Sequence, residues 1–164
     1  MKSVYLVRHA KSSWDFGNLR DIERPLNERG LKDAPFMAKL LKGKGVKPDA
    51  LISSPAVRAV TTASFFKIEF GMDGEDLLIR DEIYEAAPAT ILHLIAMLPE
   101  DLNTVLIFGH NPTFTSVVNM FAKDFIHNMP TCSIAGIHSN VNHWIDFSPD
   151  TAKVKDYFYP KLYL

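Results

Sequence analysis

Apolar residues along the chain fall into short blocks, and the spacing within each block predicts its secondary structure. Residues 3–10, 49–54 and 103–110 each contain a continuous apolar run. Such runs are typical of central strands that are covered on both faces of a sheet. Residues 77–84 form a weaker block, which we interpret as a strand that runs into a loop.

Residues 27–45 instead repeat apolar side chains at helical spacing, at Leu31, Ala34, Met37, Ala38 and Leu41. Asn27 is suited to cap the start of this helix, and Gly43 or Gly45 can end it. Pro35 either kinks the helix or marks its first turn.

Further helices are predicted over residues 55–71, 88–99 and 111–125. Ser54 is the expected N-cap of the first, with Pro55 in its first turn. Residues 133–158 alternate and turn like a β-hairpin, which indicates one or two antiparallel strands. Strands that alternate with helices predict an α/β three-layer sandwich, with a central, mostly parallel mixed sheet flanked by helices. No repeat or low-complexity tract divides the chain, so we expect residues 1–164 to form a single domain.

Composition narrows the classes of partner. The formal net charge is −1, so there is no basic field that would hold nucleic acid, and any anion site must be local. The single cysteine, Cys132, excludes an intramolecular disulfide, fits a reducing compartment and is expected to be a packed small side chain. No apolar run reaches the length of a secretory core or a membrane span. We therefore expect a cytoplasmic protein without a membrane partner.

Titratable side chains follow the three strongest strands at or just past their ends. Arg8 and His9 end the first, Arg58 follows the second, and His110 ends the third. Ligands of open α/β sheets bind at the carboxyl ends of the strands, so these four residues are expected to converge. Two arginines and two histidines without a carboxylate among them suit a compact polyanion such as phosphate.

Four motifs carry a resemblance to a known family. The motifs are RHAKSSWD at residues 8–15, RPLNERG at 24–30, SSPAVRAVTTA at 53–63 and GHNP at 109–112. With these motifs, the chain resembles the histidine phosphatase superfamily, the phosphoglycerate mutase-like group that also includes cofactor-dependent phosphoglycerate mutase. The match runs from Val4 to Asn111 in the order and approximate spacing of that family. The short segments between motifs most resemble the SixA-type phosphohistidine phosphatases.

The resemblance implies a role for each of the four residues. His9 would be the nucleophile that becomes phosphohistidine, and Arg8, Arg58 and His110 would hold the phosphate oxygens, with no metal and no cofactor. Imidazole attacks only when neutral, and nearby guanidinium groups favour its neutral form. The same cations stabilise the transferred phosphoryl group. A phosphate or sulfate ion is expected to fit this site.

The sequence does not decide which residue is the general acid that protonates the leaving group. Relatives that act on sugar phosphates carry a glutamate where this chain has Asp81, and Glu82 and Glu85 lie nearby. An alkoxide leaving group needs a proton, whereas imidazole needs far less help. The loop from Asp15 to Pro25 is expected beside the crevice, where its arginines either steer a phosphoprotein or are solvated.

The leading hypothesis is therefore a metal-independent phosphatase that works through phosphohistidine at His9 and acts on phosphohistidine in proteins. A second hypothesis is a phosphomonoesterase of the same superfamily that acts on a small phosphorylated substrate with Asp81 as general acid. A third hypothesis is a phosphate-binding regulatory module without turnover. The presence of His9 counts against it, because a module that only binds phosphate does not need a nucleophile.

Overall fold

The computed structural model describes residues 1–164 and contains one six-stranded mixed sheet. Its strands are β1 (Lys2–Arg8), β2 (Ala50–Ser53), β3 (Leu77–Ile79), β4 (Thr104–Gly109), β5 (Ile134–Ser139) and β6 (Ala152–Phe158). Their order across the sheet is β3-β2-β4-β1-β5-β6. The first four strands in this order run parallel, and β5 and β6 run antiparallel to their neighbours. The α/β fold class and the late hairpin predicted from the sequence are confirmed.

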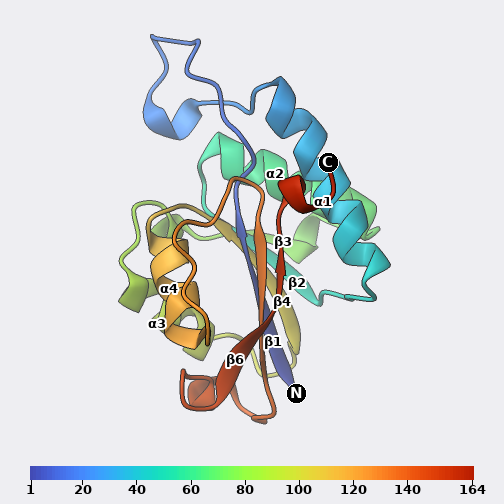
Figure 1. Ribbon diagram of the computed structural model, residues 1–164, viewed down its shortest axis with the longest axis vertical. Helices are drawn as coiled ribbons and strands as arrows, with labels where there is room; N and C mark the ends of the chain where they lie inside the picture. The colour runs from blue at the N-terminus through green and yellow to red at the C-terminus, as the bar shows by residue number, and fades with distance from the viewer.

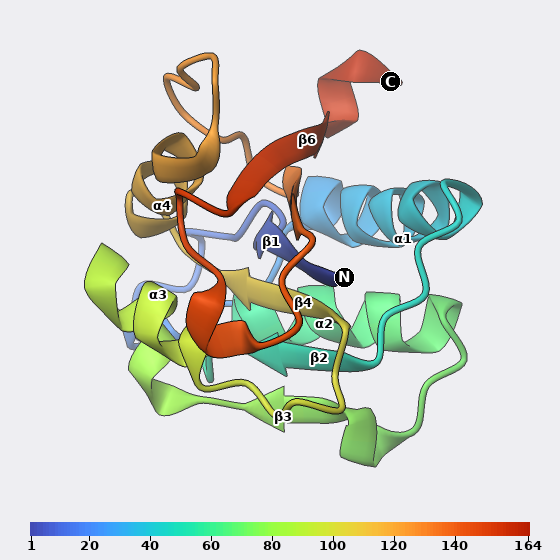
Figure 2. The ribbon, with the colours of Figure 1, turned by 90° about the horizontal axis from the view of Figure 1, so that it is seen from below.

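The helices form a layer on each face of the sheet. They are α1 (Glu28–Gly43), α2 (Val57–Glu69), α3 (Pro88–Ala96) and α4 (Thr113–Phe121). Helices α1 and α2 cover one face, and α3 and α4 cover the other (Figures 1 and 2). Short 3-10 turns lie at η1 (Asp21–Glu23), η2 (Gly74–Asp76), η3 (Asp81–Ile83), η4 (Trp144–Asp146) and η5 (Pro160–Leu162).

The two layers bury separate hydrophobic clusters because neighbouring strand residues point to opposite faces. Val4 and Leu6 of β1 join the cluster beneath α3 and α4. Tyr5 and Val7 join the cluster beneath α1 and α2. All four residues are nearly or fully buried, as expected of a strand in the middle of a sheet.

Helix α1 begins after Asn27, whose side chain accepts a hydrogen bond from the Gly30 backbone N–H, as predicted. Pro35 lies inside the helix rather than in its first turn. Leu31 was expected on the buried stripe but is 48% exposed. In that turn Gly30 faces the interior instead, because the helix lies directly against the backbone of Lys11.

Helix α2 begins later than predicted. Its first residue is Val57 and its N-cap is Ala56, which provides no side-chain capping bond. Ser54, the expected cap, uses its hydroxyl oxygen for the Ala56 N–H and for His110. The hydroxyl thus lies between the N-cap residue of α2 and His110, and it bonds none of the N–H groups in the first turn of the helix.

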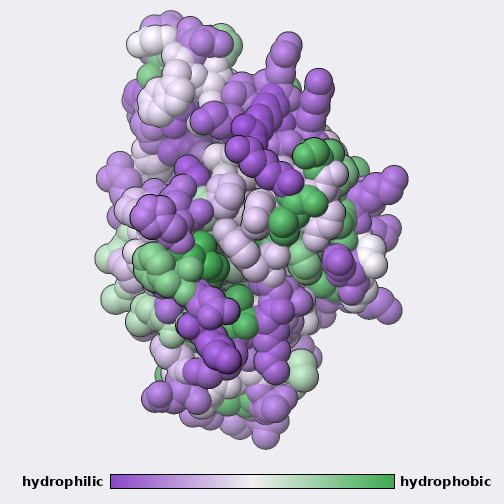
Figure 3. Space-filling view, viewed as in Figure 1, coloured by the Kyte–Doolittle hydropathy of each residue, from purple (hydrophilic) through white to green (hydrophobic).

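The molecular surface carries mixed polarity. Figure 3 shows that hydrophilic side chains cover much of one face, with hydrophobic positions in small groups between them. No helix of the structure is sufficiently long and apolar to span a membrane.

Gly30 provides a test of how α1 is docked near the end of β1. A Cβ added at Gly30 would collide with the carbonyl oxygen of Lys11, whereas one added at Gly43, in the same helix, would meet open space. Gly30→Ala should lower the free energy of unfolding by about 1–3 kcal/mol because the helix must shift. Gly43→Ala should leave it unchanged or raise it by up to about 1 kcal/mol. Urea unfolding measures both, and equal stability of the two variants would contradict the described packing.

Candidate active site

His9 lies immediately after β1 and is 7% exposed. Its backbone N–H donates to the Gly109 carbonyl at 3.0 Å, and its own carbonyl accepts from the Cys132 N–H at 3.0 Å. Its ring Nδ1 lies 2.7 Å from the Ala10 carbonyl oxygen. Because a carbonyl only accepts, Nδ1 carries the proton and Nε2 keeps its lone pair. The end of the strand therefore presents a fixed, nucleophilic nitrogen.

The surroundings keep this imidazole neutral. Burial, with a smaller contribution from the charges of Arg58 and Arg8, lowers the pKa of His9 to about 3, against the hydrogen bond to Ala10, which raises it. From the sequence alone, the nearby guanidinium groups are the expected cause of this lowered pKa. In the structure desolvation is the larger cause and the cations add to it.

Arg8 and Arg58 are each held by the protein at one edge of the guanidinium. Nη1 of Arg8 donates to the Met129 carbonyl at 2.7 Å. Arg58 donates from Nη1 to the Asp21 carbonyl at 2.7 Å and from Nη2 to the Asp21 carboxylate at 3.0 Å. The Nε of each arginine is buried and has no partner. The Nε edge of each fork is thus available to an anion.

His110 completes the cluster from the end of β4. Its ring lies 5.2 Å from the His9 ring, centroid to centroid. Its Nε2 lies 2.8 Å from the Ser54 hydroxyl, which has no other acceptor. We therefore assign the hydroxyl as the donor, which leaves the proton of neutral His110 on Nδ1. Burial lowers the pKa of His110 to about 4, and the charge of Arg58 acts in the same direction.

Three buried side-chain nitrogens of the chain have no hydrogen-bond partner: Arg8 Nε, Arg58 Nε and His110 Nδ1. All three are N–H donors, and all three belong to residues that surround His9. Buried donors that lack partners are costly, and such groups in one place point to a ligand that satisfies them. An oxyanion with several oxygens, such as phosphate, fits this donor set.

Asp21 lies outside the motifs that mark the site in the sequence. It lies in η1, on the loop above the end of β1, where Figure 1 shows a long excursion of the chain. Its carboxylate also accepts from the Tyr84 hydroxyl at 2.6 Å and pairs with Arg24 at 3.1 Å. The Tyr84 ring meets the His110 ring edge to face, with centroids 5.7 Å apart. In the sequence, the only indication of Asp21 is that its loop is expected beside the crevice. No sequence pattern indicates that Tyr84 belongs to the site.

The arginines of this loop have different surroundings. Arg20 is exposed and pairs at 3.1 Å with Glu23, which is partly exposed. Arg24 is buried, donates to the Ser12 hydroxyl at 3.0 Å and lies 3.5 Å from the centre of the Trp14 ring. Arg24 therefore anchors the loop, whereas Arg20 is solvated.

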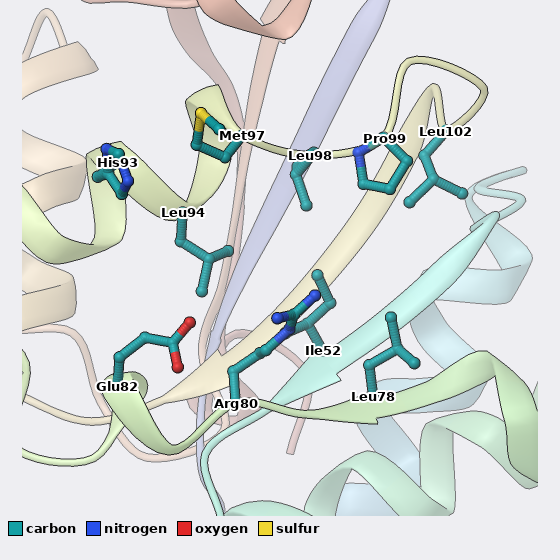
Figure 4. A pocket seen from close by; sticks show the side chains of 10 residues that line it. All are labelled: Ile52, Leu78, Arg80, Glu82, His93, Leu94, Met97, Leu98, Pro99 and Leu102. Carbon is teal, nitrogen blue, oxygen red and sulfur yellow. The ribbon is translucent and has the colours of Figure 1, made fainter.

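The three candidate acids lie in η3 or just after it. Asp81 is exposed at the start of η3, and Glu85 is exposed with a positive φ of 57°. Glu82 lines a cavity of about 240 Å³ between α3 and the β2–β3 edge (Figure 4). None of the three side chains hydrogen-bonds to Arg8, Arg58 or either site histidine, and that cavity contains none of those four residues.

A model of the histidine phosphatase superfamily (branch 1) matches residues 4–88 of the chain. The chain belongs to the histidine phosphatase superfamily. A solved SixA-type protein from Agrobacterium tumefaciens is 32% identical, with a TM-score of 0.82 over 97% of this chain and 98% of that one. The structure of the protein histidine phosphatase SixA with tungstate is 21% identical and has the same fold, with a TM-score of 0.80 over 98% of each chain.

An uncharacterized protein of Mycobacterium tuberculosis is 28% identical over 94% of this chain and 100% of its own length. The chain belongs to this superfamily and is similar to a SixA-type protein along almost its whole length. The protein is therefore a phosphatase. Arg8, Arg58 and His110 lie around His9 in the structure, and the roles that the resemblance implies for the four residues stay predictions.

The lowered pKa values of His9 and His110 predict a pH-dependent stability. Unfolding returns each imidazole to an ordinary pKa of about 6.5, so the unfolded chain binds more protons below that pH. The stabilisation is complete above pH of about 6.5 and declines as the pH falls towards the folded values of about 3 and about 4.

Between pH 7 and pH 5, one such histidine should remove about 2 kcal/mol of stability. His9→Gln should therefore lose about 2 kcal/mol less over this interval than the wild type, as measured by urea unfolding at both pH values. Identical losses in the two proteins would show that His9 is not held neutral by the fold.

Proposed function

We propose that this phosphatase removes phosphate from phosphohistidine in proteins, through a covalent phosphohistidine on His9. The observation that carries the proposal is the arrangement of buried N–H donors around a neutral histidine. Arg8 Nε, Arg58 Nε and His110 Nδ1 lack partners, and Nε2 of His9 keeps its lone pair. Similarity to SixA-type proteins supports the choice of substrate.

In the first step Nε2 of His9 attacks phosphorus, and the bond from phosphorus to the leaving group breaks. The electron pair of that bond goes to the leaving atom. The two arginines and His110 hold the equatorial oxygens, where charge accumulates during in-line transfer. Because the Ala10 carbonyl accepts the Nδ1 proton, His9 can carry the positive charge that its ring gains when Nε2 is phosphorylated.

In the second step water attacks phosphorus, and the bond to His9 Nε2 breaks. Its electron pair returns to Nε2, the ring becomes neutral, and phosphate leaves with both protons of the water. The donors that hold the oxygens in the first step hold them again in the second. This route uses side chains of the protein alone, so it calls for no metal and no cofactor.

The carboxylates around the site support phosphohistidine over a phosphate ester. An ester leaves as an alkoxide and needs a proton from a well-placed acid. Asp81, Glu82 and Glu85 make no hydrogen bond to the residues around His9, and Asp21 is held as a carboxylate by its partners. An imidazole leaving group places a much smaller demand on an acid.

A phosphorylated form of His9 is the expected intermediate. Brief mixing of the wild type with a phosphorylated histidine peptide should label the protein with phosphate that is acid-labile and base-stable. His9→Ala should remain unlabelled and lose at least about 10³-fold in turnover, because the nucleophile is gone. Labelling is quantified after acid and base treatment. Equal labelling of both proteins, or binding of phosphate without any turnover, contradicts the proposal.

A small phosphomonoester is the second candidate substrate. Asp81 begins η3, and Tyr84, the residue directly after this turn, has a ring that contacts His110. Asp81 therefore lies on a segment that borders the site, which is the observation that favours this candidate.

Asp81→Asn separates the two substrate classes. If phosphohistidine is the substrate, the variant should keep its turnover of a phosphohistidine peptide within about 3-fold, because imidazole leaves without the acid. Turnover of a panel of phosphomonoesters should be slow in the wild type and fall further in the variant. Fast ester turnover that Asp81→Asn reduces by about 100-fold would instead establish the phosphomonoesterase.

A further inference from the structure

Asp21 joins three parts of the structure at the entrance of the site. Its carboxylate bonds to Arg58 of α2 at 3.0 Å, to Tyr84 beyond η3 at 2.6 Å and to Arg24 of its own loop at 3.1 Å. Neither the motifs nor the superfamily match assigns a task to this residue. It is the carboxylate that lies closest in the bonding network to the proposed phosphate cradle.

The partners of Asp21 keep it ionised. The Tyr84 hydroxyl, followed by Arg58 and Arg24, lowers the pKa of the Asp21 carboxyl to about 2 against the opposing effect of burial. At neutral pH it has no proton to donate to a leaving group. It can only accept hydrogen bonds, which excludes a general-acid role for it.

Asp21 is more exposed than the groups around His9. His9 is 7% exposed, and the Arg58 side chain is also 7% exposed, so these groups form the floor of the site. The Asp21 side chain is 50% exposed and is bonded to Arg58. In-line transfer puts the leaving atom opposite His9 Nε2. Because the substrate must reach this buried histidine from solvent, the leaving group stays on the exposed side of the floor, to which Asp21 belongs.

We propose that Asp21 accepts the N–H of the leaving imidazole and thereby makes the site selective for phosphate carried on histidine. The inference rests on the proposed function and adds a specificity-determining residue to it. The carboxylate stabilises the substrate in the form that is protonated on its distal ring nitrogen. A phosphate ester has no such N–H, and the same carboxylate repels its charge.

The step balances without any added proton. Nε2 of His9 forms the new bond to phosphorus, and the bond between phosphorus and the substrate nitrogen breaks with its electron pair returning to that nitrogen. The substrate imidazole already carries a proton on its distal nitrogen, so it leaves neutral. Transfer thus runs between two imidazoles, of which His9 donates its distal N–H to the Ala10 carbonyl and the substrate donates to Asp21.

Asp21→Asn tests this with phosphoimidazole as the phosphate donor. The amide keeps the size of the side chain and an oxygen for Arg58 but removes the charge. Phosphorylation of His9 by phosphoimidazole should slow by about 10- to 100-fold, the usual range for loss of a hydrogen bond to a charged group. The affinity for inorganic phosphate should be unchanged or tighter, because Arg58 stays in place and one negative charge is gone.

Asp15→Asn is the matched control, since it makes the same change on the same loop at an exposed side chain without a bonding partner. It should leave both measurements unchanged. Loss of phosphate affinity in parallel with the rate in Asp21→Asn would show that Asp21 only positions Arg58, and an unchanged rate would show that it does nothing in transfer. Either result overturns the inference alone. A wild type that takes no phosphate from phosphoimidazole would overturn the proposed function with it.

The pH dependence adds a readout that a structural role would not produce. The charged and titratable groups facing Asp21 are Arg58, Arg24, Tyr84 and His110, and Glu85 lies near Tyr84. At saturating phosphoimidazole, the ratio of wild-type to Asp21→Asn rates should rise as the pH increases through the ordinary imidazole range of about 6.5, because the carboxylate keeps the bound substrate protonated to a higher pH than the amide does. A ratio that is constant between pH 5.5 and 7.5 would contradict the inference.

Discussion

Parallel pairing of β4 with both β1 and β2 is the constraint on which the site depends. Arg8 pairs with Gly109 in register, and the ladder continues past the strands, from the His9 N–H to the Gly109 carbonyl and from the Ser54 N–H to the Phe108 carbonyl. Because the ladders end together, three chain segments turn away from the sheet at one level. A shift of any strand would separate groups that now lie within a few ångströms of one another.

The same burial that makes these strands central also sets the chemistry at their ends. Desolvation holds His9 and His110 neutral, and a neutral imidazole is what a nucleophile requires. Met129 bonds one edge of the Arg8 guanidinium, and Asp21 bonds one edge of the Arg58 guanidinium. The Nε of each arginine is left without a protein partner and can bind an anion. The fold thus concentrates N–H donors around an unprotonated nitrogen, and it does so with backbone carbonyls and one loop carboxylate.

What was predictable from the sequence followed from proximity to apolar runs. Arg8, His9 and His110 directly adjoin strands, so the topology of a parallel sheet was enough to bring them together. Asp21 lies in one 3-10 turn and Tyr84 directly after another. The directions of these turns depend on tertiary contacts, so the convergence of the two residues could not be predicted from their spacing. Ser54 is not the helix cap because α2 begins only at Val57, which local preference did not indicate; its oxygen accepts from the Ala56 N–H and its proton goes to His110.

The position of Asp21 suggests a different requirement from the general acid that the carboxylates near the site do not supply. A search for a proton donor assumes that the leaving group departs as a strong base. Transfer from one imidazole to another has no such need, since both rings carry a distal proton before and after the step. What such a transfer requires is an acceptor for each distal N–H. The Ala10 carbonyl provides one within the core, and a permanently ionised carboxylate at the entrance is suited to provide the other.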